Sequence, residues 1–423
     1  MCGVAGVYGV SKSMTVILGL LDALQYRGGQ GSGIAFIRDD GAHFCRREPD
    51  EVAELARDID FGSLDESRFT AGIGHLRYGT AGVRRALKNT QPFYGRTSFG
   101  DIYLSHNGDT PFFAREREKL LEDGAALVSD SDSELFLHYI GRSANIGSIE
   151  AVKAGIESYP GTFTLVLLLD DSDGVKLILA RDASGNRPLF LGRLGDGFIA
   201  ASEDSAFEAV SGTKIREINP GEMLVLFGKS TRSYWLEHKF SPVKTPQHCV
   251  FENIYFSFPN SNIFGLPVAQ FRENLGRKAA KNFSYAIKDG DVIANVPDSS
   301  NAFADGFSSK LGRPLERVLI RRHMTRSFTK ESIYLREEAV RRKFSVNPEK
   351  IAGRRVWILD DSIVRGITSR RLTRLLRSQG ASWVGVIVSC PPIIGPCGKG
   401  IDFSEEGLIA RKYLSENNKT DID

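Results

Sequence analysis

Residues 355–369 read RVWILDDSIVRGITS, and this stretch sets the expected fold of the second half of the chain. The apolar run 356–359 predicts a buried strand, which ends in the acids Asp360 and Asp361. A short polar loop then leads, through Gly366, into a helix. In a doubly wound sheet, ligands bind beyond the carboxyl ends of the strands, where loop N–H groups and a helix N-terminus suit a phosphate. The carboxylates suit a ribose diol or Mg²⁺, and the alternative is an acid-rich turn that caps the helix.

The residues around this stretch alternate between short apolar runs and a helical pattern. Further strands are predicted at 291–296, 318–320 and 384–388. Leucines on one face predict a helix over 369–379, which ends at Gly380. Strands that alternate with helices predict an α/β fold with a doubly wound parallel sheet. The polar segment 241–247 contains two prolines and predicts the join with the first half.

Residues 1–235 have a different texture, with many glycines and short apolar runs. Strands are predicted at 4–10, 33–37, 69–75, 102–105, 163–169, 177–180, 198–201 and 223–227. Only a few helices are expected between them, for example over 15–24 and 133–140. This pattern predicts an α+β domain with stacked sheets.

The composition is that of an ordinary globular protein, with 423 residues, of which 41% are hydrophobic and 25% are charged. No apolar run approaches the roughly 18 residues of a membrane-spanning helix, and the first ten residues do not resemble a signal peptide. The five cysteines are an odd and sparse set, which argues against a disulfide framework and predicts reduced thiols in a cytoplasmic protein.

The net charge of +3 conceals an uneven distribution. Residues 310–377 contain 19 Lys and Arg against 7 Asp and Glu. Such a local block favours a polyanionic ligand at one place, so we expect neither nucleic acid nor a membrane as a partner. A solvated helix face such as 336–343 explains the charge equally well, and nucleic-acid binding by this block is a weaker alternative.

Cys2 is a candidate nucleophile. If Met1 is removed, Cys2 carries both a thiol and a free α-amine. An α-amine has a reference pKa of about 7.7–8.0, so it can convert the thiol into a thiolate near neutral pH. One residue would then supply both nucleophile and base. The alternative is that a cysteine follows Met without any role.

Other segments of the first half carry groups that suit an α-amino acid. Arg77 could hold a carboxylate through paired hydrogen bonds. Asn107 and Gly108 offer an amide and an unhindered N–H, which suit an oxyanion hole. Asp132 lies in the segment 131–134, which either caps a helix or supplies a carboxylate for a substrate ammonium. Together with a thiol, these groups fit glutamine, whose side-chain carbonyl is open to attack.

The first half contains, in order, MCGVAGVYG, HLRYGTAG, NTQPF, HNGD, SDSE, RDASGNRPL, ASE and NPGE. This series resembles the N-terminal-nucleophile (Ntn) glutaminase domain, a class II glutamine amidotransferase, of the amidophosphoribosyltransferases (glutamine phosphoribosylpyrophosphate amidotransferases). The resemblance implies that Cys2 attacks the glutamine amide. It further implies that Arg77 and Asp132 hold the α-groups of glutamine and that Asn107 and Gly108 form the oxyanion hole.

The stretch 355–369 resembles the phosphoribosylpyrophosphate (PRPP) signature of the type I phosphoribosyltransferases. It is most similar to the form of this signature found in the amidophosphoribosyltransferases. Its flanking segments agree as well, so the resemblance covers about residues 1–404. The implied domains are a glutaminase over 2–240, a phosphoribosyltransferase over 248–404 and a short C-terminal tail over 405–423.

The resemblance also implies ligands for the second half. Mg²⁺ is expected at Ser299, Asp360 and Asp361. The 5′-phosphate of PRPP is expected on a loop made of Ser362, Ile363, Val364, Arg365, Gly366, Ile367 and Thr368. The implied enzyme transfers ammonia from glutamine to carbon 1 of PRPP and gives 5-phosphoribosylamine, glutamate and pyrophosphate, the first step of de novo purine biosynthesis. Purine nucleotide inhibitors and a homo-oligomer, a dimer or tetramer, are further implications.

Several positions depart from the family pattern. The family reads RGQESAG where residues 27–33 read RGGQGSG, and Gly79 replaces a serine in HLRYGT. The loop at 321–328, which closes over PRPP in the family, is one residue shorter and begins with Arg321 in place of lysine, and Ile367 replaces a threonine. These changes leave an alternative, a divergent relative that binds PRPP or nucleotides as a non-catalytic regulator or an uncoupled glutaminase.

Some members of the family carry a [4Fe–4S] cluster on four cysteines, two of them in a late C-x-x-C pair. Cys249 and Cys397 match the first two ligands, but no late pair occurs before Asp423. We therefore expect no such cluster unless Cys390 or another thiol substitutes. Cys249 and Cys397 are otherwise expected to be small buried residues.

Overall fold

The structure is a computed structural model that describes residues 1–57, 59–62, 64–79, 86–143, 146–237, 245–321, 344–401 and 407–417. Contacts within the chain divide it into two compact units. The first contains Met1–Cys249, Phe256–Gly265 and Cys397–Asp402, and the second contains Val250–Tyr255, Leu266–Pro396 and Phe403–Asp423. The predicted closing loop after Arg321, the helix face 336–343 and parts of the join 241–247 and of the tail 405–423 lie outside the described residues.

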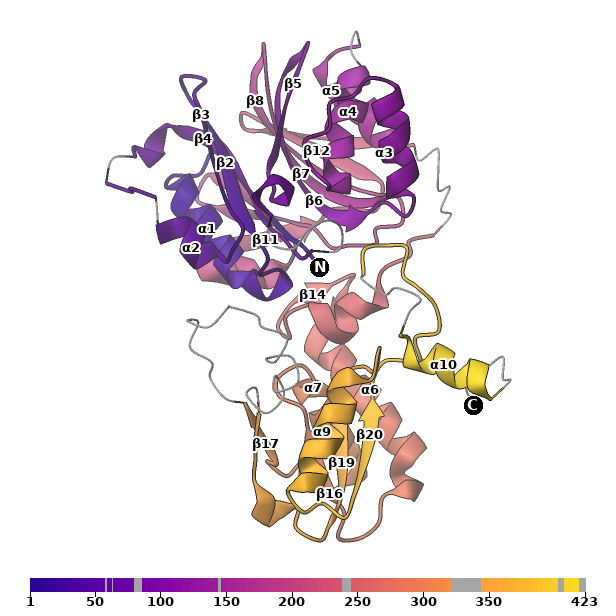
Figure 1. Ribbon diagram of the computed structural model, residues 1–423. Helices are drawn as coiled ribbons and strands as arrows, with labels where there is room; N and C mark the ends of the chain where they lie inside the picture. Colours follow the sequence, from indigo (N-terminus) through magenta and orange to yellow (C-terminus); the bar gives the residue numbers. More distant parts are fainter. Residues whose placement is uncertain are drawn as a thin grey trace. The chain divides into compact units, whose positions relative to one another are not determined.

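The first unit is built on two antiparallel sheets (Figure 1). One follows the order β11-β9-β10-β1-β4-β2-β3, with β1 Gly3–Tyr8, β2 Ser32–Arg38, β3 His43–Glu48, β4 Phe69–Leu76, β9 Phe190–Leu194, β10 Gly197–Ala201 and β11 Thr213–Glu217. The other follows the order β13-β12-β8-β7-β6-β5, with β5 Phe93–Thr97, β6 Gly100–Asp109, β7 Thr162–Asp171, β8 Gly174–Arg181, β12 Glu222–Phe227 and β13 Ser230–Trp235. The short strand β14 is Asn262–Ile263.

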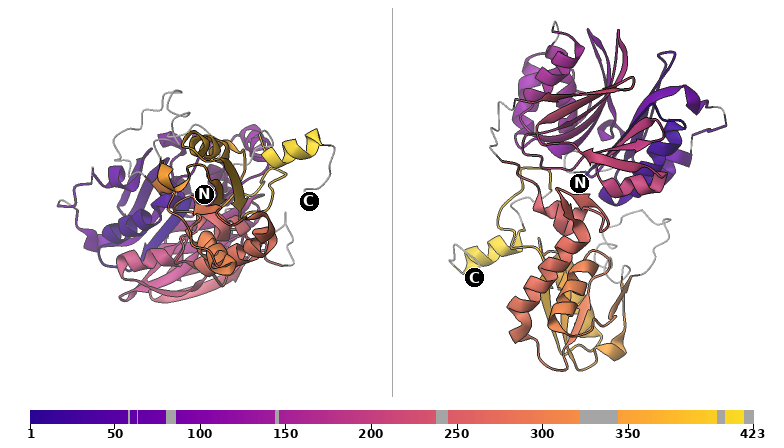
Figure 2. Two further views of the ribbon diagram at one scale, coloured as in Figure 1. Left: turned by 90° about the horizontal axis from the view of Figure 1, so that it is seen from below. Right: turned by 180° about the vertical axis from the view of Figure 1, so that it is seen from behind.

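Helices cover the outer face of each sheet, so the first unit has four layers, as the view from behind also shows (Figure 2). The helices are α1 Ser13–Ala23, α2 Val52–Arg57, α3 Phe113–Glu122, α4 Leu135–Arg142 and α5 Ser148–Glu157. Strand β7 explains why the sheets stack. Val166 and Leu168 enter the core between the sheets, whereas Leu165 and Leu167 enter the core beneath α4 and α5. Because side chains alternate along a strand, one continuous apolar run fills both cores.

The second unit is built on a parallel sheet with the order β16-β19-β20. Its strands are β16 Val292–Asn295, β19 Arg355–Asp360 and β20 Trp383–Val388, and its helices are α6 Val268–Phe283, α7 Asn301–Leu311, α9 Ile367–Ser378 and α10 Ile409–Glu416. Val356 and Ile358 of β19 pack with α9, whereas Trp357 and Leu359 pack with α6 and α7 on the other face. The sheet is therefore covered by helices on both faces.

The predicted fold class is confirmed in both halves, and one strand pairs differently from the expectation. The predicted run 318–320 corresponds to β17 Leu319–Arg321, which pairs antiparallel with β18 Phe344–Val346 and not with the parallel sheet. An apolar run of this length indicates a strand without specifying its partner. The short strand β15 is Leu266–Pro267. In the described part of the chain, no helix combines the length and apolarity needed to cross a bilayer.

Candidate active site

The start of the first strand brings Cys2 and Arg77 together. β1 and β4 pair antiparallel with Gly3 opposite Leu76, so Cys2 and Arg77 extend from the same edge of the sheet. Burial lowers the pKa of Arg77, and the negative charge of a Cys2 thiolate nearby counteracts this shift. The Cys2 Sγ lies 3.8 Å from the carbonyl oxygen of Tyr78. The predicted nucleophile and the predicted carboxylate-binding arginine are therefore neighbours.

Arg27 holds the main chain of Cys2, a contact that the sequence did not reveal. Its Nε donates to the Cys2 carbonyl oxygen at 3.0 Å, and its Nη1 pairs with Glu203. The side chains of Arg27 and Glu203 are both 0% exposed. The second carboxylate oxygen of Glu203 accepts from the N–H of Phe258 at 2.8 Å and from the hydroxyl of Ser261 at 2.6 Å. A fully bonded buried ion pair thus fixes the backbone beside the thiol.

Strand β6 carries the predicted oxyanion-hole residues. Asn107 is buried, and its side-chain Nδ2 has no hydrogen-bond partner in the described part of the chain. A Cβ placed at Gly108 would lie 2.0 Å from the carbonyl oxygen of Thr162, so only glycine fits there. β6 packs against both β1 and β4. A buried amide donor without a partner, on a strand packed against that of Cys2, is what an oxyanion hole requires.

A buried neutral network fixes β6 from both sides. His75 at the end of β4 contacts the carbonyl oxygen of His106 through Nε2 at 3.0 Å. Burial lowers the pKa of His75 to about 3 and that of His106 to about 4, so both rings are neutral. The His106 Nδ1 lies 2.9 Å from the hydroxyl oxygen of Ser133. The same oxygen accepts a hydrogen bond from the side-chain amide of Gln91 at 2.9 Å. The network therefore joins the strands of Arg77 and Asn107 to the segment of Asp132.

The capping interpretation of the segment 131–134 is confirmed for Ser131, and the substrate-binding interpretation stays a prediction for Asp132. The Ser131 hydroxyl accepts from the N–H of Ser133 and caps a short 3₁₀ helix, Asp132–Glu134. Asp132 is buried, and its carboxylate accepts from the N–H of Thr110 at 3.0 Å. Burial raises the pKa of Asp132 to about 6. An incoming ammonium group would favour the charged form of this carboxyl, so the geometry suits a substrate α-amine.

Two departures from the family pattern contact each other. The N–H of Gly79 donates to the side-chain Oε1 of Gln30 at 2.9 Å. A Cβ at position 79 would lie 2.3 Å from the same oxygen. Gly79 stands where the resemblance expects a serine, and Gln30 lies in the altered stretch 27–33. The glycine therefore makes room for the glutamine side chain.

The acids of the second unit lie at the carboxyl end of β19. Asp360 and Asp361 are 6% and 8% exposed. The Asp361 carboxylate accepts a hydrogen bond from the hydroxyl of Ser362 at 2.7 Å. The backbone N–H of Asp361 donates to the carboxylate of Asp360 at 3.0 Å. Ser299 lies in the half-buried segment after β16, which is the parallel neighbour of β19. All predicted Mg²⁺ ligands therefore lie at the same edge of the sheet.

The predicted phosphate loop leads into α9 through Gly366. This residue has a φ of +65°, and a Cβ there would lie 2.8 Å from the side chain of Ile409. Arg365, Ile367 and Thr368 are exposed, whereas Ser362, Ile363 and Val364 are half-buried. Most residues of the loop and of the first turn of α9 are therefore accessible to solvent, at the helix N-terminus where an anion site would lie.

The donor chemistry of this edge suits Mg²⁺. The side chains supply only carboxylate and hydroxyl oxygens, which a hard cation prefers. Within the described ranges, no group of three or more His, Cys, Asp or Glu side chains is arranged for a metal ion. Mg²⁺ is usually held by one or two carboxylates together with substrate phosphates. Cys249 and Cys397 are half-buried in the first unit and form no disulfide within the described residues, and the absence of an iron–sulfur cluster stays a prediction.

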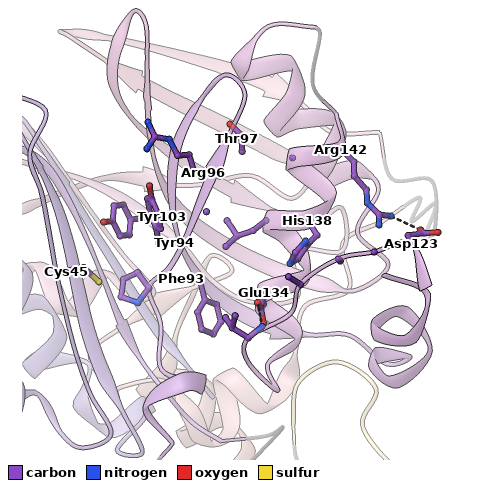
Figure 3. A pocket seen from close by; sticks show the side chains of 18 of the residues that line it. Cys45, Phe93, Tyr94, Arg96, Thr97, Tyr103, Asp123, Glu134, His138 and Arg142 are labelled. Atoms are coloured by element: carbon purple, nitrogen blue, oxygen red, sulfur yellow. Dashed lines mark hydrogen bonds and ion pairs between the residues drawn. The ribbon is translucent and has the colours of Figure 1, made fainter. Parts of the chain in front are cut away.

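A separate cavity of about 760 Å³ lies in the first unit beside the edge strand β5 (Figure 3). Tyr94 and Tyr103 line one side, and His138 and Arg142 line the other. Cys2, Arg77, Asn107 and Asp132 are not among the described residues that line it. Glu134, at the rim, instead accepts from the N–H groups of residues 128 and 129 at 2.8 Å. The cavity therefore lies apart from the candidate glutamine site.

Comparisons with known proteins agree with this geometry. A family described as "Glutamine amidotransferase domain" matches residues 81–209, and one described as "Phosphoribosyl transferase domain" matches residues 269–399. The amidophosphoribosyltransferase of Bacillus subtilis is 35% identical over 100% of this chain and 86% of its own length. That of Methanocaldococcus jannaschii is 34% identical over 100% of this chain and 89% of its own length. Amidophosphoribosyltransferase 1, chloroplastic, of Arabidopsis thaliana is 36% identical over 98% of this chain and 71% of its own length.

Solved structures agree as well. A structure described as the allosteric regulatory enzyme of purine biosynthesis has a TM-score of 0.85 and 34% identity, over 99% of this chain and 88% of its own. The glutamine PRPP amidotransferase of Bacillus subtilis, in complex with ADP and GMP, has the same TM-score and identity, over 99% of this chain and 90% of its own.

Proposed function

The chain belongs to the amidophosphoribosyltransferase family, and we propose that Cys2 and the carboxyl end of β19 are the centres of its two half-reactions. The enzyme transfers the amide nitrogen of glutamine to PRPP and gives 5-phosphoribosylamine, glutamate and pyrophosphate, in purine biosynthesis.

In the first half-reaction, Arg77 binds the α-carboxylate of glutamine and Asp132 binds its α-ammonium group. Once Met1 is removed, the α-amine of Cys2 takes the thiol proton, and the sulfur attacks the amide carbon. The Asn107 side-chain amide and the Gly108 N–H donate to the oxygen of the tetrahedral intermediate. The ammonium group of Cys2 then returns a proton to the departing nitrogen. Ammonia leaves, and water hydrolyses the γ-glutamyl thioester to glutamate.

In the second half-reaction, ammonia attacks carbon 1 of PRPP as the bond to pyrophosphate breaks. The loop made of residues 362–368 binds the 5′-phosphate through its N–H groups and the start of α9. The carboxylates of Asp360 and Asp361 face the ribose hydroxyls and, with Ser299, would hold Mg²⁺. The bound ion would neutralise charge that develops on the leaving pyrophosphate.

The remaining assignments follow from the family resemblance. We propose a glutaminase domain over 2–240, a phosphoribosyltransferase domain over 248–404 and a tail over 405–423. A homo-oligomer, feedback inhibition by purine nucleotides and a cytoplasmic location are also proposed. The complex of the Bacillus subtilis relative with ADP and GMP supports the nucleotide proposal.

The unpartnered Nδ2 of buried Asn107, on a strand packed against that of Cys2, is the single observation that carries the glutaminase assignment. The test measures pyrophosphate release from PRPP and Mg²⁺ with either glutamine or ammonium chloride. The wild type should use both nitrogen sources, Cys2→Ala only ammonium, and Asp361→Asn neither. Cys45→Ala, an exposed thiol on β3, is the matched control and should use both.

Two outcomes would contradict the assignment. One is a wild-type protein that releases no pyrophosphate with either nitrogen source. The other is a Cys2→Ala variant that still uses glutamine. The intact mass supplies a further check, because the proposed base exists only if Met1 has been removed.

A further inference from the structure

Two acids of the first unit meet at the end of β6, and the proposed mechanism uses only one of them. Asp109 is the last residue of β6. The next residue, Thr110, donates its N–H to the carboxylate of Asp132 at 3.0 Å. Asp132 belongs to a different segment, the short 3₁₀ helix Asp132–Glu134. The fold thus brings Asp109 beside an acid that lies 23 positions further along the chain.

Asp109 lies on the face of β6 that carries the proposed oxyanion donor. Tyr103 enters the core between the two sheets, whereas Ile102 and Leu104 enter the core beneath α4 and α5. Because side chains alternate along a strand, Asn107 and Asp109 share the face of Tyr103 and are about 7 Å apart along the strand. The Nδ2 of Asn107, a residue that is 1% exposed, has no partner in the described part of the chain. This buried donor indicates a place for a polar ligand on the same face.

A buried tyrosine faces both carboxyls. Tyr159 is 1% exposed, and its hydroxyl contacts the hydroxyl of Thr110. Burial raises the pKa of Tyr159, and the negative charges of Asp132 and Asp109 raise it further. Thr110 and Tyr159 therefore form a wall that the two carboxyls share.

The groups around Asp109 do not neutralise it fully. Burial raises the pKa of Asp109 to about 6, and the negative charge of Asp132 adds to this shift. His106, the N–H of Gly400 and Arg187 act in the opposite direction. Burial keeps His106 neutral above its own pKa of about 4, so Arg187 is the positive charge among these groups.

The groups around Asp132 are neutral. The N–H groups and hydroxyls of Thr110 and Ser133 donate hydrogen bonds to its carboxylate, which lowers its pKa. Burial has the larger effect and raises the pKa to about 6. Both acids are therefore ready to take up a proton near pH 6, and each faces the other.

We propose that Asp109 and Asp132 form a carboxyl pair that holds one proton in the free protein near pH 6, and that the α-ammonium group of glutamine displaces this proton when it binds. The proposal deepens the proposed function and rests on it. Two neighbouring carboxylates repel each other, so the pair keeps a proton until a positive charge enters. An ammonium group has three N–H donors and can bond to both carboxylates. The displaced proton passes to solvent, which reaches half-buried Asp109.

The number of protons released on binding measures the pair directly. Glutamine is titrated into Cys2→Ala, which cannot form the thioester, by isothermal titration calorimetry in two buffers that differ in their enthalpy of ionisation. PRPP and Mg²⁺ are present throughout, as in the overall reaction. At pH 6 the pair should release about one proton for each glutamine bound, whereas one carboxyl with a pKa of about 6 would release about half a proton. At pH 8 the release should be close to zero.

A second variant identifies the partner acid. Asp109→Asn, combined with Cys2→Ala, keeps the size of the side chain and removes the second carboxyl. Its release at pH 6 should fall to about half a proton, the amount expected from Asp132 alone. Asp101→Asn is the matched control, because Asp101 lies on the same face at the other end of β6 and contacts the hydroxyl of Tyr94 at 2.8 Å. The control should still release about one proton, and a merely structural role of Asp109 would change the affinity without changing this number.

The outcomes separate this proposal from the proposed function. If Cys2→Ala binds no glutamine at pH 8, the proposed glutamine site fails and this proposal falls with it. If Cys2→Ala binds glutamine but releases about half a proton or less at pH 6, the glutamine site stands and the pair is wrong. A release of about one proton in the Asp109→Asn variant overturns the role of Asp109. If that variant has lost its ammonia-dependent reaction, its fold is damaged, and the number for Cys2→Ala decides.

Discussion

Asp132 is a buried carboxyl whose charge depends on pH within the working range of an enzyme. Its pKa is raised to about 6 by burial. Below this value the carboxyl takes up a proton and loses the charge that holds the substrate ammonium. The KM for glutamine should therefore rise about tenfold for each pH unit below 6, measured in the glutaminase assay between about pH 5 and 8. Asp132→Asn should show a high KM without this pH dependence.

A neighbouring acid provides the control for Asp132. Asp130 is half-buried, and its pKa is lowered by its pairing with Lys88. Asp130→Asn should leave the pH profile of the KM unchanged. A flat wild-type profile between about pH 5 and 7 would contradict the assigned role of Asp132.

The same pKa shift of Asp132 affects stability with a definite sign. Its folded-state pKa lies above the reference value of about 3.9, so the folded state binds more protons than the unfolded state between about pH 4 and 6. The contribution of Asp132 to the free energy of unfolding is therefore largest below pH 4 and falls as the pH rises to about 6. A buried acid that is less stabilising at neutral pH fits a role in binding.

Substitution of Arg27 tests whether its contact with the main chain of Cys2 positions the nucleophile. Arg27→Lys keeps the charge, but a single ammonium group cannot reproduce the separate bonds to the Cys2 carbonyl oxygen and to Glu203. We expect the glutamine-dependent kcat to fall about tenfold, while the ammonia-dependent kcat stays unchanged. Steady-state assays with both nitrogen sources measure this. Arg57→Lys, in an exposed pair with Glu54, should alter neither rate, and equal losses in both reactions would contradict a local role for Arg27.

The turn into α9 is an element that tolerates substitution poorly. Gly366 adopts a left-handed conformation, which costs other residues about 1–2 kcal/mol, and a Cβ would crowd Ile409. Gly366→Ala should therefore raise the KM for PRPP about tenfold and leave basal glutaminase unchanged. Gly141→Ala, at a position where a Cβ meets nothing within 4 Å, is the matched control. A normal KM for PRPP in Gly366→Ala would show that this loop does not bind the phosphate.

The strands were predictable from the sequence where a continuous apolar run places alternate side chains in the cores on both faces of a sheet. The run 163–169 became β7 and the run 356–359 lies within β19, because both faces of each strand are buried. The partner of β17 was not predictable, since pairing depends on residues distant in sequence. The network around His106 was missed for the same reason: its partners His75, Gln91 and Ser133 come from three other segments.

Across the whole molecule, the predicted site residues could be placed at the ends of strands from the sequence. The long-range contacts that hold these residues in position could not. Asn107 and Asp360 were found because a polar group follows or ends an apolar run. Arg27 lay in the quoted stretch 27–33, yet its role needs Glu203, a residue far away along the chain. Support of this kind is a long-range contact, and a local pattern carries no signal for it.

The central claim is that nitrogen freed at Cys2 reaches PRPP held at the carboxyl end of β19. The most direct measurement supplies glutamine labelled with ¹⁵N in its amide, together with PRPP, Mg²⁺ and an excess of unlabelled ammonium, near pH 7. The account predicts that most of the 5-phosphoribosylamine formed by the wild type carries the label, whereas Cys2→Ala forms only unlabelled product. Product that carries no label in the wild type, or the same labelled fraction in Cys2→Ala, would contradict it.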